Sequence, residues 1–187
     1  MRDPEQTKGG FRVDKHTVHT LTEELRNGSQ DAFAQLYEEW KTPVFTIIFR
    51  IVQSKETAED VMQDVFIKLY RSPPDRTVKN PRAWFFACAR NAAIDALRKK
   101  SNSDFPLSEV EPHTGDPIVY ADTRIDVETA LSRLPQLQRE IVTLHINAQL
   151  GFSQIAGIVG HSLSYTYRQY RLAIQTLQNE LNGGITR

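Results

Sequence analysis

An acidic, proline-containing segment divides the chain into two parts. Residues 101–122 hold three prolines, one glycine and five acidic side chains, but no lysine or arginine. Such a composition buries too little apolar surface to offset the entropy lost when a chain is ordered, so we expect a flexible linker. The linker is placed at 101–124. It separates a unit at 17–100 from a smaller unit at 125–187, and we expect a loose, polar arm at 1–16.

Both units are expected to be helical. Apolar residues recur at spacings of three and four, which is typical of amphipathic helices, and no segment predicts a strand. The expected fold class is therefore all-α, with two small helical domains. Pro43 is expected to break or kink the second helix, because proline lacks the amide donor. The buried stripe of the third helix is expected to include Val61, Val65, either Ile67 or the stem of Lys68, and Leu69. The expected packing face of the last helix consists of Leu163, Tyr167, Tyr170, Ile174, Leu177 and Leu181.

Composition argues for a chain without enzymatic chemistry. Lysine plus arginine and aspartate plus glutamate number 23 each, so a nucleic-acid partner must be met by local patches. No metal-ligand cluster, phosphate-binding loop or nucleophile–base pair is evident, so we expect no cofactor and no metal. The lone cysteine, Cys88, fits a reducing compartment, and no apolar stretch is long enough to span a bilayer. We therefore expect a cytoplasmic protein that does not insert into a membrane.

The strongest local pattern is a helix-turn-helix at residues 152–177. Ala156 is small enough for a close helix crossing, Gly160 suits a left-handed turn, and Ser162 can cap the second helix. Polar side chains that can reach phosphates and base edges lie off the packing face: Ser164, Tyr165, Arg168, Gln169 and Arg171. An ordinary helical hairpin with a solvated face explains this pattern about equally well.

A second pattern lies between Lys79 and Lys100. Cations alternate with rings there, as single-stranded DNA binding requires. The cations are Lys79, Arg82, Arg90 and Arg98, and the rings are Trp84, Phe85 and Phe86. The alternative is that the rings are core residues, which we expect to hold in part for Trp84 and one of the phenylalanines.

Four segments, in order, resemble the extracytoplasmic-function (ECF) sigma factors of the sigma-70 family. AEDVMQDVFI at 58–67 is similar to the "AEDVVQETFL" of region 2.2, and NPRAWF at 80–85 with ARNAAIDALR at 89–98 is similar to regions 2.3 and 2.4. LSRLPQLQRE at 131–140 resembles the start of region 4, and residues 154–162 match its helix-turn-helix. The resemblance covers about 19–100 and 125–182.

The resemblance implies a promoter-recognition subunit for core RNA polymerase. Region 2.2 of the family binds the clamp helices of the beta-prime subunit, region 4 meets the beta flap, and anti-sigma factors commonly silence its members. Matching positions for polymerase binding are Asp60, Gln63, Asp64 and Phe66. Those for −10 DNA, including a flipped base, are Lys79, Asn80, Arg82, Trp84, Arg90, Asn91 and Arg98. Those for the −35 major groove are Ser162, Ser164, Tyr165, Arg168, Gln169 and Arg171.

The helix-turn-helix departs from the family pattern. Where the family reads "SVGTVKSRLHRA", this chain has Thr166 in place of a buried valine, Tyr167 in place of a lysine and Gln169 in place of an arginine. Fewer cations predict a shallower dependence of −35 binding on salt. The family's usual glycine before the motif is replaced by Gln149.

Two rival functions remain open from the sequence. A sigma-like regulator that uses its helix-turn-helix without polymerase would not need Asp60, Gln63 or Asp64. A helical protein–protein adaptor would tolerate alanine at Arg168 and Arg171. The acidic linker is likewise open: the resemblance implies that it threads the RNA exit path of the polymerase, but a solubilising tether has the same composition.

Overall fold

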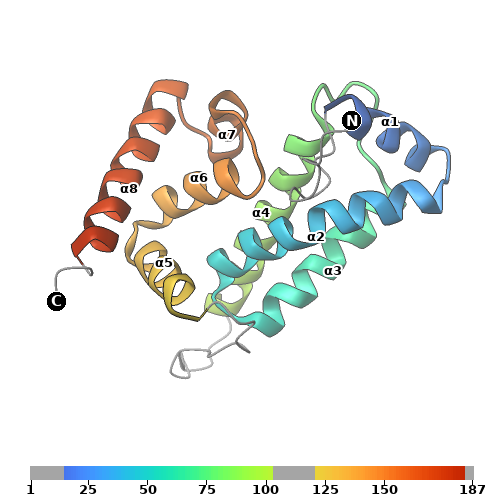
Figure 1. Cartoon of the computed structure of the whole chain (residues 1–187). Helices are drawn as coiled ribbons and strands as arrows, with labels where there is room; N and C mark the ends of the chain where they lie inside the picture. Colours follow the sequence, from blue (N-terminus) through green and yellow to red (C-terminus); the bar gives the residue numbers. More distant parts are fainter. Residues whose placement is uncertain (1–14, 103–120, 184–187) are drawn as a thin grey trace, which may run out of the picture.

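The computed structural model of the chain describes residues 15–102 and 121–183, and this part of the protein contains helices and no strands (Figure 1). The all-α prediction is confirmed. The N-terminal half comprises α1 (Lys15–Arg26), α2 (Gln30–Val52), α3 (Lys55–Arg71) and α4 (Pro81–Asn102). The C-terminal half comprises α5 (Ala121–Arg133), α6 (Gln136–Ile146), α7 (Phe152–Val159) and α8 (Leu163–Gly183). Most of the predicted arm and linker lies outside the described residues.

Local capping sets the boundaries of the first helices. Gly28, at a φ of 87°, turns the chain after α1, and the Ser29 hydroxyl accepts the Ala32 amide at 3.2 Å to open α2. The Ser54 hydroxyl accepts the Thr57 amide at the start of α3. These side chains satisfy amides that have no partner within the helix, which is why the predicted starts are confirmed.

The second helix does not break at Pro43. It runs without interruption from Gln30 to Val52, so a break at this position is wrong. Trp40, Val44 and Ile47 flank the proline and are all buried, with exposed fractions of 2% or less. Packing on both sides of the proline holds the helix together despite the missing amide donor.

The N-terminal half has an aromatic centre. The Trp40 ring of α2 stacks on the Phe85 ring of α4 with centroids 4.9 Å apart, and Phe86 lies 6.1 Å from the same indole. Both phenylalanines are buried, whereas Trp84 is only partly buried. The rings at the start of α4 therefore serve mainly the core.

Small buried residues lie where the helices of the C-terminal half approach one another. Ala156 of α7 and Ala173 of α8 are buried, and Gly160 links these helices at a φ of 74°. The predicted packing face of α8 is partly wrong, because Leu163 and Tyr167 are about half exposed. Thr166 and Ala173 take the buried positions instead, since short side chains let α8 lie close to α6 and α7.

The two halves pack against each other, with α6 beside α2 and α7 beside α4 (Figure 1). Buried apolar residues of the C-terminal half belong to the same continuous cluster as the core of the N-terminal half: Ile141, Leu144, Ala148, Leu150 and Ile155. The division into separate domains stays a proposal.

Candidate functional site

One face of α3 carries the acidic and amide groups predicted to bind polymerase. Asp60, Gln63 and Asp64 are all exposed, and spacings of three and four place them side by side on the helix. Ser54 fixes where α3 begins, and thereby the direction in which these side chains project. The face offers carboxylate and amide acceptors to a basic partner.

Phe66, the predicted apolar anchor of this face, lies inside the protein. Its side chain is 4% exposed, and its ring centroid lies 4.7 Å from that of Tyr37 and 5.2 Å from that of Phe85. The exposed apolar side chains of α3 are Ile67 and Tyr70, each 46% exposed. The prediction that either Ile67 or the stem of Lys68 is buried is wrong: both residues are exposed, because α3 is turned so that Phe66 faces the aromatic core.

Asn80 and Lys79 lie where the loop after α3 enters α4. The Asn80 side-chain oxygen accepts the Ala83 amide at 2.9 Å, so Asn80 caps α4, and Pro81 occupies the first helical turn, where no amide donor is needed. The Lys79 side chain is exposed, and its carbonyl accepts a bond from the His19 ring at 3.2 Å. Asn80 thus has a structural role, while Lys79 extends a cation into solvent.

Further along α4, Asn91 and Arg98 are exposed and Trp84 is partly buried. Asn91 is one residue away from Arg90, so the two side chains point to different sides of the helix. Of the predicted −10 residues, Lys79, Asn91 and Arg98 have side chains at the surface.

Arg82 and Arg90 are covered by the C-terminal half. The Arg82 side chain is 14% exposed; its Nε donates to the Ala148 carbonyl at 2.9 Å, and its Nη1 lies 3.6 Å from the Glu39 carboxylate. Burial lowers the pKa of Arg82, and Glu39 opposes that shift. Arg90 is 16% exposed and donates from Nε to Glu140 at 2.7 Å. Neither guanidinium faces solvent as a DNA ligand would.

The helix-turn-helix is formed by α7, Gly160 and α8. The Ser162 hydroxyl accepts the Tyr165 amide at 3.2 Å and so caps α8, as predicted from the sequence. Ser164 is exposed in the first turn of α8. The Arg168 guanidinium lies over the Tyr165 ring, 5.2 Å from its centroid, which holds both groups at the surface of the first turns.

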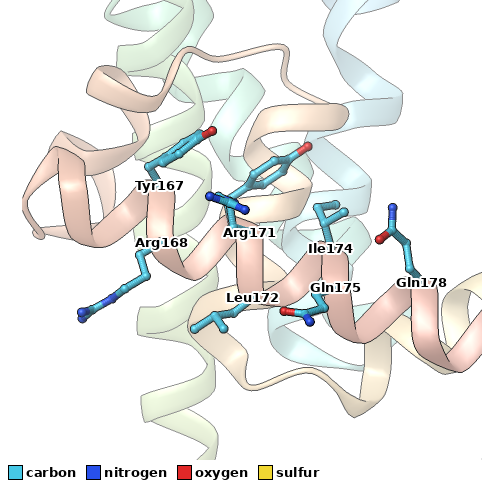
Figure 2. A pocket seen from close by; sticks show the side chains of 8 residues that line it. Tyr167, Arg168, Arg171, Leu172, Ile174, Gln175 and Gln178 are labelled. Atoms are coloured by element: carbon cyan, nitrogen blue, oxygen red, sulfur yellow. The ribbon is translucent and has the colours of Figure 1, made fainter.

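The remaining predicted groups of α8 differ in direction. Figure 2 shows the surface pocket along α8, where Arg168 and Tyr167 project to opposite sides of the helix and Arg171 lies further along it. Gln169 is turned toward α6, where its side-chain oxygen accepts a bond from Gln138 at 3.0 Å. Arg168 and Arg171 are therefore the accessible cations of the pocket.

Sequence reasoning missed Arg50 and Glu140. Arg50 bonds to three residues of the C-terminal half, and Glu140 is 7% exposed although it is charged. The available signal was the position of Arg50 within the apolar run of α2, since an isolated cation in such a run requires a partner. No pattern along the sequence identifies that partner.

Residues 15–102 and 121–183 contain no group of three or more metal-ligating side chains. None of the helices in these residues is both long enough and apolar enough to cross a membrane.

Comparison with known proteins matches this arrangement to one family. The model of sigma-70 region 2 matches residues 36–103. The ECF RNA polymerase sigma factor SigK of Mycobacterium sp. (strain KMS) is 25% identical over 172 residues, covering 87% of this chain and 89% of that protein. Residues 36–103 thus match sigma-70 region 2, and the chain is similar along most of its length to ECF RNA polymerase sigma factors.

Solved structures agree in fold. The sigma factor RpoE in complex with the anti-sigma factor NepR from Bartonella quintana superposes with a TM-score of 0.69 at 22% identity, covering 85% of this chain and all of that one. CnrH in complex with the cytosolic domain of CnrY gives a TM-score of 0.62 at 19% identity, covering 88% and 96%.

Proposed function

We propose that this chain binds core RNA polymerase through α3 and recognises promoter DNA through α4 and α8, as a cytoplasmic initiation factor without catalytic chemistry of its own. The observation that carries the proposal is the exposed row of Asp60, Gln63 and Asp64 within the segment matched by sigma-70 region 2. A helix face with two carboxylates and no cation among these three positions suits a basic helix, such as those of a polymerase clamp.

The apolar part of the polymerase contact is assigned to Ile67. It lies three residues beyond Asp64, and hence on the same face of α3, and it is 46% exposed. Phe66 supports this face from below by packing on Tyr37 and Phe85. Alanine at Ile67 should weaken polymerase binding without unfolding the protein, whereas alanine at Phe66 should destabilise the fold.

Promoter opening is assigned to the start of α4, and −35 binding to α8. Lys79, just before α4, and Asn91, within α4, are exposed in the segment assigned to −10 DNA. Ser164, Arg168 and Arg171 are exposed on α8. Because Gln169 is bonded to Gln138, it is left out of the −35 contacts. Recognition of two separate promoter elements by two units agrees with the proposed division of the chain near residues 101–124.

The proposal is tested by run-off transcription with bacterial core polymerase and a promoter library. We expect transcripts that depend on the added protein, and the double variant Asp60→Asn, Asp64→Asn should abolish them together with core binding in a pull-down. Glu38→Gln is the matched control, since Glu38 is an exposed acid on α2 whose partner is Lys41. Transcription that survives loss of the α3 carboxylates would contradict the polymerase assignment.

The −10 assignment has its own test. Asn91→Ala should weaken promoter opening, followed by permanganate reactivity of the −10 thymines, while leaving core binding intact. Equal loss of core binding would show that Asn91 serves the fold.

An anti-sigma partner is a further part of the proposal. The RpoE and CnrH structures contain such partners, NepR and CnrY. Because this chain shares their fold, we expect a protein of that class to bind it.

A further inference from the structure

The segment around α8 is free of acidic side chains. Residues 141–179 hold two arginines, Arg168 and Arg171, and no aspartate or glutamate, although cations and anions balance in the chain as a whole. Glu180, the first acid after this segment, is paired with Arg133 of α5. A helix that carries positive charge without opposing carboxylates attracts a polyanion, and the major groove of double-stranded DNA admits an α-helix.

Two large apolar side chains flank the cations of α8. Tyr167 and Leu172 are 48% and 45% exposed. Tyr167 lies four residues before Arg171, and Leu172 lies four residues after Arg168, so each is the surface neighbour of a guanidinium. Figure 2 shows Leu172 on the side of α8 to which Arg168 projects, and Tyr167 on the other side. The accessible surface of α8 therefore presents cationic and apolar groups next to each other.

The core of the C-terminal half needs neither side chain. Thr166 and Ala173 fill the buried positions beside them, each with 0% exposure. The Tyr167 ring meets the Phe152 ring edge to face, with centroids 5.2 Å apart, and this contact fixes its direction while leaving about half of it in water. One exposed leucine alone would imply no partner. The implication comes from the position of Leu172 among cations on a segment without acids.

The two kinds of group on this surface match different features of the major groove. Arginine binds phosphates and the O6 and N7 acceptors of guanine, whereas apolar side chains contact the 5-methyl group of thymine. Tyr167 and Leu172 are separated by about 7.5 Å along the helix axis, which corresponds to about two base-pair steps. Both side chains can therefore contact thymines that lie close together in one promoter element.

We propose that Tyr167 and Leu172 determine the specificity of the −35 contact by packing against thymine methyl groups, while Arg168 and Arg171 hold α8 on the phosphates. This inference rests on the proposed function, because it requires α8 to enter −35 DNA. It adds two specificity-determining residues and the chemical group that they recognise. A methyl contact removes apolar surface from water and releases no counterions, so its contribution should not depend on salt.

The test removes the methyl groups from the DNA. The full chain, with and without core polymerase, is first used to select duplexes from a random pool. Each thymine of the selected −35 element, on both strands, is then replaced by deoxyuridine, which lacks only the 5-methyl group. We expect two thymines, within about three base pairs of each other, at which the replacement weakens binding about fourfold, as for the loss of one buried methylene-sized group.

Variants then assign each methyl group to a side chain. Leu172→Ala should abolish the deoxyuridine penalty at one thymine and Tyr167→Ala at the other, because a missing side chain has no methyl contact to lose. Val127→Ala is the matched control, since Val127 is a 38% exposed apolar residue of α5, outside the helix-turn-helix, and both penalties should persist. Arg171→Ala should instead weaken binding to all sequences and reduce its salt dependence, with both penalties unchanged.

The outcomes separate this inference from the proposed function. Deoxyuridine penalties that are absent, or that persist in full in both Leu172→Ala and Tyr167→Ala, would overturn the inference even if transcription depends on the protein. Penalties that the variants abolish with the chain alone, without any transcription by polymerase, would refute the proposed function and leave the methyl contacts standing. Failure to select any duplex, with or without polymerase, would overturn both.

Discussion

Replacing Thr166 with valine should stabilise the protein. Thr166 is 0% exposed, and its hydroxyl oxygen is buried without a hydrogen-bond partner. Burying a hydroxyl without a partner costs about 1–3 kcal/mol, whereas valine has the same shape and nearly the same helix propensity. Since α8 already accommodates a β-branched side chain there, the substitution should recover about 1–2 kcal/mol of unfolding free energy.

Thermal unfolding followed by circular dichroism measures the effect. If the whole chain unfolds as one unit, each kcal/mol should raise Tm by about 2–4 °C; if the C-terminal half unfolds alone, by about 4–8 °C. The size of the shift therefore also reports on how tightly the halves are coupled.

Thr143→Val is the matched comparison. Thr143 is equally buried, but its hydroxyl donates to the Arg139 carbonyl at 2.8 Å and accepts from Arg50. Valine there should lower Tm, because it leaves the Arg50 guanidinium with one acceptor fewer. A Tm for Thr166→Val equal to or below that of the unchanged protein would refute the reasoning about its hydroxyl.

Three other predictions, two of them substitutions, follow from local structure. Gln149 has a φ of 53°, a conformation that strains a side chain but not glycine, so Gln149→Gly should raise the unfolding free energy by up to about 1 kcal/mol in urea titrations. Ser54→Ala should cost about 1 kcal/mol, because the Thr57 amide at the start of α3 loses its acceptor. Burial raises the pKa of the Cys88 thiol, so its alkylation by iodoacetamide should follow a pH–rate profile displaced to higher pH than that of free cysteine; an undisplaced profile would contradict this.

Helix ends were predictable because their causes are local. Ser29, Ser54 and Ser162 each accept an amide three residues ahead, and Gly160 supplies the left-handed turn between α7 and α8. Capping depends only on residues close in the chain, so it can be read from the sequence. The exposure of Asp60 on α3 likewise follows from helix periodicity.

Burial that depends on contacts between distant parts of the chain was not predictable in the same way. Whether Phe66 or Ile67 turns inward depends on the rings of Tyr37 and Phe85, which reach α3 only through the tertiary fold. The break expected at Pro43 followed from the local cost of a proline inside a helix, but burial of the neighbouring residues outweighed that cost.

The partners of the predicted DNA-binding arginines were hidden for the same reason. Arg90 meets Glu140 across fifty positions, and Arg82 meets the carbonyl of Ala148 across 66. Charge patterns along the chain therefore marked these side chains as available, although the fold engages them internally.

The apolar layer between the halves has a consequence for the protein in solution. If the C-terminal half moves away, Ile141, Leu144 and Ile155 come into contact with water together with the apolar residues of the N-terminal half in the same cluster. Soluble monomers rarely tolerate large apolar patches, and such surfaces cause self-association. A chain whose halves have separated should therefore self-associate at high concentration. Binding to polymerase should then also protect the separated halves from aggregation.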